Sequence, residues 1–86
     1  MTDLQKLADL ALDVCNENGW SRRWQNAGCY LHLEASEFIE ALRGKGESTP
    51  EEEAADVLFV LLSTCAGNDL RMDKVLAEFN RKCLGV

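Results

Sequence analysis

The most constraining feature of this chain is an apolar run, Val57 to Leu62, that follows a marked helix start. Residues 49–52 (Thr-Pro-Glu-Glu) combine a favourable N-cap, a proline for the first helical position and a glutamate that can complete a capping box. A helix begun there ends at about Ala66, because Gly67-Asn68 is a stop signal. Since the run leaves no polar stripe, this helix is expected to be buried on every side.

Three further segments carry apolar residues at helical spacing, and no strand pattern or repeat competes with them. The predicted helices span residues 4–14, 30–42, 49–66 and a stretch that begins near Asp69 or Asp73. Residues 20–28 are expected to form a loop or a single turn. We therefore predict one all-α domain over residues 1–86, an antiparallel four-helix bundle-like fold. A chain of 86 residues buries a small core, so completion by oligomerisation is also expected.

The net charge of −6 argues against partners such as nucleic-acid polymers and anionic membranes, because their phosphates repel an acidic surface. Residues 1–6 contain neither the basic region nor the apolar run of a signal peptide. The longest apolar run is far too short to span a bilayer. A cytoplasmic location is the resulting expectation.

The cysteines, Cys15, Cys29, Cys65 and Cys83, are scattered along the chain. None forms a Cys-x-x-Cys pair, and His32 is the only histidine, which makes a structural zinc site a poor interpretation. All four are expected to be small core residues in a reducing compartment.

Two pairs of acidic residues at i,i+3 spacing fall on the apolar sides of neighbouring predicted helices. At about 100° per residue, Glu34 lies inside the apolar arc of its helix and Glu37 lies at the edge of that arc. Glu53 and Asp56 share one face of the next helix, beside Val60. An ionised carboxylate that is buried without a partner costs several kcal/mol, so something must compensate these charges.

A hard divalent cation, which prefers oxygen ligands, would compensate these carboxylate charges directly. No lysine or arginine lies within either carboxylate turn. Mg²⁺ is the favoured ion, and Mn²⁺ could substitute for it. Iron fits less well, because di-iron bundles use a histidine three residues after a glutamate and this chain has none there.

At these residues the chain resembles the MazG-like all-α nucleoside triphosphate pyrophosphohydrolases. Their motif is usually written Glu-Glu-x-x-Glu, a spacer and Glu-x-x-Asp. It appears here as residues 33–37 (Leu-Glu-Ala-Ser-Glu) and 53–56 (Glu-Ala-Ala-Asp), with leucine at the first glutamate position. Residues 79–82 (Phe-Asn-Arg-Lys) are similar to the family's Asn-x-Lys. Residues 19–24 resemble the tryptophan-bearing segment that precedes the first metal-binding helix.

The resemblance implies hydrolysis between the α- and β-phosphates of a nucleoside triphosphate, with a role in the house-cleaning of nucleotide pools. It implies that Glu34, Glu37, Glu53 and Asp56 bind the metal. Glu37 is our preferred general base, since it lies at the edge of the apolar arc. Lys82 would pair with phosphate charge as part of the catalytic machinery.

The remaining candidates would contact the substrate. Asn80 would donate or accept a hydrogen bond, and Trp20 and Trp24 could stack on the base. The alternative for both tryptophans is a role as core or interface aromatics. Arg23, with its neighbour Arg22, could reach the phosphates, although exposed arginines in a loop are often simply solvated.

Two other interpretations remain open. One is a catalytically idle MazG-like bundle that binds nucleotides or a partner protein. The other is a helical interaction module whose acidic residues pair with Lys6, Arg43 and Lys74. Under the favoured interpretation, the apolar run of residues 57–62 predicts a homodimer or homotetramer with that helix near the interface. A neighbouring subunit could then supply part of the substrate pocket.

Overall fold

Helices form at the segments that the sequence predicts, and the all-α fold is confirmed. The computed structural model describes residues 3–85, except for the side chain of Cys29. The helices are α1 (Asp3–Glu17), α2 (Trp24–Leu42), α3 (Pro50–Gly67) and α4 (Met72–Leu84). No strand occurs between residues 3 and 85. None of the helices in this part of the chain has the length and apolar character that a membrane span requires.

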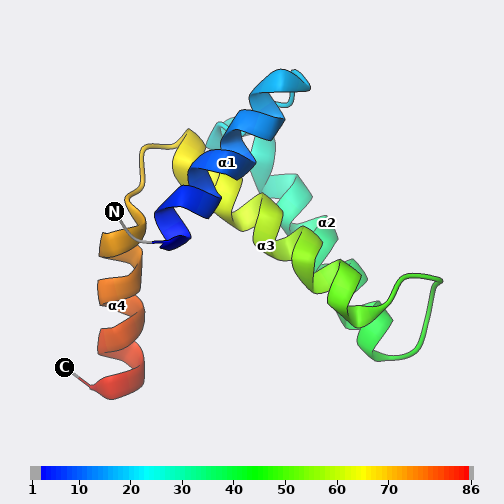
Figure 1. The fold of residues 1–86 in the computed structure, drawn as a ribbon. Coiled ribbons are helices and arrows are strands. Elements are labelled where there is room, and N and C mark those ends of the chain that lie inside the picture. The colour runs from blue at the N-terminus through cyan, green and yellow to red at the C-terminus, as the bar shows by residue number, and fades with distance from the viewer. Residues whose placement is uncertain (1–2, 86) are drawn as a thin grey trace.

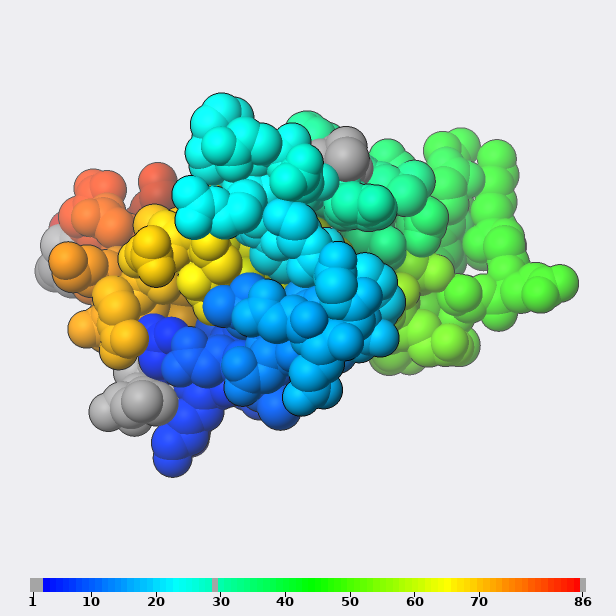
Figure 2. All heavy atoms as spheres, turned by 90° about the horizontal axis from the view of Figure 1, so that it is seen from above, coloured from blue at the N-terminus to red at the C-terminus, as the bar shows by residue number. Residues whose placement is uncertain are grey.

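Helix α3 is the central element, because it packs on both α1 and α2. Helices α2 and α3 run antiparallel, and the 43–49 loop joins them at one end of the molecule (Figure 1). Helix α4 packs mainly on α1 and projects away from the α2–α3 pair. Seen from above, α4 and the 43–49 loop lie at opposite ends of the molecule (Figure 2). The chain by itself is thus a three-helix unit with a fourth helix attached at its far end.

The core is small and lies where α1, α3 and the start of α4 meet. Its buried members are Ala8, Leu62, Cys65 and Met72, with Leu4 and Ala66 packed against them. On α3, however, Leu58 and Leu61 remain 49% and 43% exposed. The prediction that α3 is buried on every side is therefore wrong for the single chain, because α1 and α2 cover only part of its circumference.

The start of α3 confirms the capping box. The Glu52 N–H donates to Thr49 Oγ1 at 3.1 Å, and the Thr49 N–H donates to Glu52 Oε1 at 3.3 Å. Pro50 occupies the first helical turn, where its missing N–H carries no cost. All three signals are local in sequence, which is why this boundary could be predicted.

Helix α2 begins at Trp24, so the prediction of a loop or single turn over residues 20–28 is wrong from Trp24 onward. The cap comes from a residue 44 positions away in the sequence. Asn68, just after α3, accepts the Trp24 N–H through Oδ1 at 3.0 Å. Its Nδ2 donates to the Arg22 carbonyl at 2.8 Å and to the Thr64 carbonyl at 2.7 Å. This side chain ties the end of α3 to the start of α2.

Helix α4 begins in a similar way. The Met72 N–H donates to Oε1 of Gln5, a residue of α1, at 2.9 Å. The start lies next to the predicted Asp73, whereas Asp69 adopts a left-handed conformation (φ 62°) in the connecting loop. Two of the helix starts therefore depend on side chains that are distant in the sequence.

The cysteines divide into two groups. Cys15 and Cys65 are buried free thiols, as predicted, and burial raises the pKa of Cys65. Cys83 is exposed, so its assignment to the core is wrong. It lies near the end of α4, the part of the chain that no other helix covers (Figure 1). The prediction for the Cys29 side chain falls outside the described residues.

Candidate metal centre

Three of the four predicted metal ligands converge at the α2–α3 interface. Glu34 and Glu37 lie one turn apart on α2, and Glu53 lies in the first turn of α3. Each offers a carboxylate oxygen, and these oxygens all lie within 4.8 Å of one another. The antiparallel packing of α2 on α3 therefore places three carboxylates around one point.

Asp56 lies outside this group. It is exposed, whereas the helical pattern predicted a position where an unpaired charge would be hard to tolerate. That expectation is wrong, because the face of α3 that carries Asp56 is open in the single chain. The Asp56 charge is nevertheless close enough to Glu34 to raise the pKa of Glu34.

Burial is unequal among the three converging carboxylates. Glu53 is only 8% exposed, Glu34 is partly buried and Glu37 is exposed. Oε2 of Glu34 and Oε2 of Glu53 are both buried and accept no hydrogen bond. Among residues 3–85, none of the ion pairs involves Glu34, Glu37, Glu53 or Asp56. Orphaned carboxylate oxygens with no basic partner are suited to a hard cation such as Mg²⁺.

Every influence on Glu34 disfavours its charged form. Burial makes the largest contribution to raising its pKa above the usual 4.5, followed by the charges of Glu37, Asp56 and Glu53. A side-chain hydrogen bond with Glu37 acts in the same direction. A bound cation would reverse the effect of all these charges, because it favours the ionised form.

The raised pKa of Glu34 predicts how the stability of the metal-free protein depends on pH. The folded state holds the Glu34 proton more tightly than the unfolded state, so the unfolding free energy falls as pH rises through the interval above about 4.5. We expect the Glu34→Gln variant to gain stability relative to the wild type as pH rises above about 4.5. Urea unfolding in EDTA measures this difference. A difference that does not change with pH would contradict the prediction.

The two tryptophans lie on the surface near the start of α2. Trp20 and Trp24 are both exposed, so neither is a core residue of this chain. Trp20 lines a cavity of about 590 Å³ together with Arg22 and Tyr30, and Trp24 does not. Tyr30 lies one turn before Glu34 on α2. Its i,i+4 spacing from Glu34 places the two side chains on the same face of α2.

Arg22 and Arg23 differ sharply. Arg23 is exposed, but Arg22 is buried, and its Nε donates to Ser63 Oγ at 3.0 Å. The Arg22 guanidinium lies 5.6 Å from the Tyr30 ring centre and 6.0 Å from that of Phe59. The expectation that Arg22 is solvated is therefore wrong. It joins the segment before α2 to the middle of α3.

Asn80 and Lys82 lie on α4 and are exposed. Lys82 lines a groove of about 540 Å³ that is formed by α4 and the loop before it. Because α4 is at the opposite end of the molecule from the 43–49 loop, the acidic cluster and these two residues are separated within one chain (Figures 1 and 2). Their contact with substrate remains a prediction.

A cleft of about 370 Å³ lies beside the acidic cluster. Glu37 and Glu53 line it, together with Lys45 of the α2–α3 loop. The sequence interpretation did not single out Lys45. Its one signal was its position between two glycines at the end of a predicted helix.

The family model of the MazG nucleotide pyrophosphohydrolase domain matches residues 24–85 of this chain. The match contains α2, α3 and α4, including all four predicted metal ligands, and leaves α1 outside. Neither the curated proteins nor the solved structures give a significant match. Since the matched region exceeds half of the sequence and contains the carboxylates that converge, the chain belongs to the MazG nucleotide pyrophosphohydrolase family.

Proposed function

We propose that this chain is a cytoplasmic, Mg²⁺-dependent nucleoside triphosphate pyrophosphohydrolase that cleans nucleotide pools. It would convert a ribo- or deoxyribonucleoside triphosphate and water to the monophosphate and pyrophosphate. The observation that carries the proposal is the cluster of Glu34, Glu37 and Glu53, with carboxylate oxygens within 4.8 Å of one another. Family membership supports a nucleotide as the substrate.

The acidic residues would have different roles, metal binding or proton transfer, according to their burial. Glu34 and Glu53 present buried oxygens without partners and would hold Mg²⁺, or Mn²⁺ in its place, with Asp56 adding charge from the exposed side. The ion would supply neutralisation of phosphate charge during the reaction. Glu37 is exposed and lines the neighbouring cleft, so it is the carboxylate best placed to accept a proton from water.

In the proposed reaction, the water oxygen forms a bond to the α-phosphorus as Glu37 takes the water proton. The bond between the α-phosphorus and the oxygen that bridges to the β-phosphate breaks. That oxygen leaves with its electron pair as part of pyrophosphate. The exposed tryptophans, Trp20 and Trp24, and Arg23 would contact the nucleoside and phosphates from the start of α2.

Pyrophosphate release tests the proposal. The full chain is incubated with Mg²⁺ and each of the common ribo- and deoxyribonucleoside triphosphates, with matched reactions in EDTA. We expect release from at least one nucleotide and no release in EDTA. Nucleotide binding without product would favour the idle bundle instead. Neither binding nor product would favour an interaction module.

We further propose that a second copy of the chain covers the apolar groove between α1 and α3, giving a homodimer or homotetramer. The groove is lined by Leu7, Leu10, Ala11, Val14, Ala55, Leu58, Phe59 and Leu62. Most of the buried apolar residues of the single chain are alanine or cysteine, while many large apolar side chains are exposed. A second copy would bury such surface and could bring the Asn80 and Lys82 of its α4 near the carboxylates.

An aspartate at position 58 is expected to break this assembly, because it places a charge in the apolar groove. Leu58→Asp should shift the particle mass measured by light scattering toward 9.6 kDa, the mass of one chain. Asn16→Asp is the matched control, since Asn16 is exposed on α1 and does not line the groove. A wild-type protein that is already a 9.6 kDa monomer would refute the assembly.

A further inference from the structure

The cleft beside the acidic cluster combines an acidic wall with a single basic residue. It is lined by Ser36, Glu37, Glu40, Ala41, Lys45, Gly46, Glu47, Ser48 and Glu53. Among these lining residues Lys45 is the only one with a positive charge. Glu37 and Glu53 both line the cleft and both belong to the acidic cluster. The cleft therefore adjoins the candidate metal centre.

The end of α2 fixes the backbone of Lys45. The Lys45 N–H donates to the Glu40 carbonyl at 3.0 Å, and the Gly44 N–H donates to the Ala41 carbonyl at 3.1 Å. Gly44 has φ +78°, so the two bonds form a Schellman motif. Because Gly44 adopts a conformation that favours glycine, the chain can turn sharply and bring Lys45 back over the last turn of α2.

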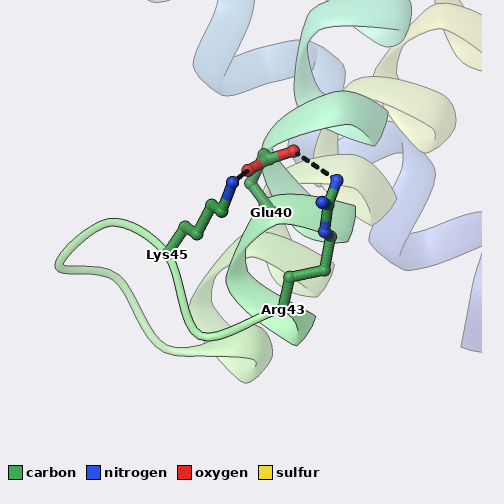
Figure 3. Close-up of polar contacts among 3 residues, drawn as sticks. All are labelled: Glu40, Arg43 and Lys45. Atoms are coloured by element: carbon green, nitrogen blue, oxygen red, sulfur yellow. Dashed lines mark hydrogen bonds and ion pairs between the residues drawn. The ribbon is translucent and has the colours of Figure 1, made fainter.

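The ammonium group of Lys45 is held only loosely. Its Nζ lies 4.0 Å from Glu40 Oε2, while Arg43 Nη1 approaches Oε1 of the same carboxylate more closely, at 3.3 Å (Figure 3). The Lys45 side chain is 63% exposed. An exposed pair of this kind contributes little to stability, and Arg43 can neutralise Glu40 by itself. Lys45 can therefore leave Glu40 for a more highly charged partner.

We propose that Lys45 binds the β- and γ-phosphates of the substrate, the part that leaves as pyrophosphate. This inference rests on the proposed function. Within one chain, Lys82 lies at the far end of the molecule, so Lys45 is the positive charge beside Glu37 and Glu53. Negative charge grows on the leaving group as its bond to the α-phosphorus breaks, and an ammonium group beside it stabilises that charge.

The test is calorimetric titration of the full chain with inorganic pyrophosphate in the presence of Mg²⁺. Lys45→Ala is expected to weaken binding about tenfold or more, which corresponds to the loss of one charge-assisted contact. Arg43→Ala is the matched control. Arg43 carries the same charge and pairs with the same Glu40, but it does not line the cleft. Its removal leaves Lys45 as the remaining partner of Glu40, so binding should weaken by no more than the roughly two- to fivefold that this pair can cost, clearly less than in Lys45→Ala. Lys45→Arg should recover part of the affinity.

A second variant is expected to strengthen pyrophosphate binding. Glu40→Gln releases Lys45 from its competing carboxylate and is expected to strengthen pyrophosphate binding about two- to fivefold. That gain should shrink in the Lys45→Ala background, because the double variant has no ammonium group to release.

The outcomes separate this inference from the proposed function. Equal pyrophosphate affinity in Lys45→Ala and Arg43→Ala would overturn the role of Lys45, even if the wild type hydrolyses nucleotides. Conversely, the wild type could release no pyrophosphate from any nucleotide while Lys45→Ala still weakens pyrophosphate binding. The proposed function would then fail, and the phosphate-binding role of Lys45 would stand.

Discussion

Replacement of Glu53 by glutamine is expected to lower Mg²⁺-dependent pyrophosphate release by about 10²–10³-fold, equivalent to roughly 3–4 kcal/mol of transition-state stabilisation. Glu53 is the most buried of the converging carboxylates, at 8% exposed, and its Oε2 has no hydrogen-bond partner. The amide keeps the shape of the side chain but removes the negative charge that would hold the cation. Initial rates at saturating Mg²⁺ measure the loss.

The same substitution is expected to stabilise the metal-free protein by about 1 kcal/mol, because an amide at position 53 can donate to the unpartnered oxygen of Glu34. Urea unfolding in EDTA measures this gain, which Mg²⁺ should cancel by stabilising only the wild type. A loss of activity coupled to a gain of stability is the result expected of a metal ligand. Replacement of a residue needed only for packing would lower both the activity and the unfolding free energy.

Glu51→Gln is the control for this experiment. Glu51 lies in the same first turn of α3 and carries the same charge, but it is exposed and lies outside the cluster. Its replacement therefore reproduces any effect of net charge or of the helix dipole. The role of Glu53 would be refuted if Glu53→Gln kept activity within about threefold of Glu51→Gln.

The sequence predicted the parts of the site whose causes are local. Glu34 and Glu53 lie toward the α2–α3 interface because helical periodicity and the Thr49 capping box fix their faces. Asp56 was misplaced because a helix that is apolar all round does not reveal which of its sides the rest of the chain covers. Lys45 was missed because its place beside Glu53 depends on how the 43–49 loop returns, and spacing along a helix does not contain that information.

The helix starts show the same division. The residues that begin α3 are neighbours in sequence, whereas Asn68 caps α2 and Gln5 caps α4 from distant positions. A local pattern could not show these starts, because the hydrogen-bond acceptors are supplied only after the chain has folded. The position of α4, which packs mainly on α1, is likewise a property of tertiary packing.

Alanine at position 67 is expected to lower the unfolding free energy by about 1–3 kcal/mol. A Cβ atom there would lie 3.0 Å from Arg22 Cβ and 3.0 Å from the Arg22 carbonyl oxygen. The Arg22 backbone cannot retreat freely, because its carbonyl accepts a hydrogen bond from Asn68 and its side chain is held by Ser63. The substitution would therefore push the start of α2 away from the end of α3.

Gly28→Ala provides the opposite expectation within the same fold. Gly28 lies inside α2, and a Cβ atom there would meet nothing within 4 Å. Alanine should stabilise the protein by about 0.5–1 kcal/mol, since glycine is the poorer helix former. Urea unfolding of both variants tests the close approach of position 67 to Arg22 directly. If Gly67→Ala is as stable as Gly28→Ala, the Arg22–Asn68 connection does not fix the start of α2 against the end of α3.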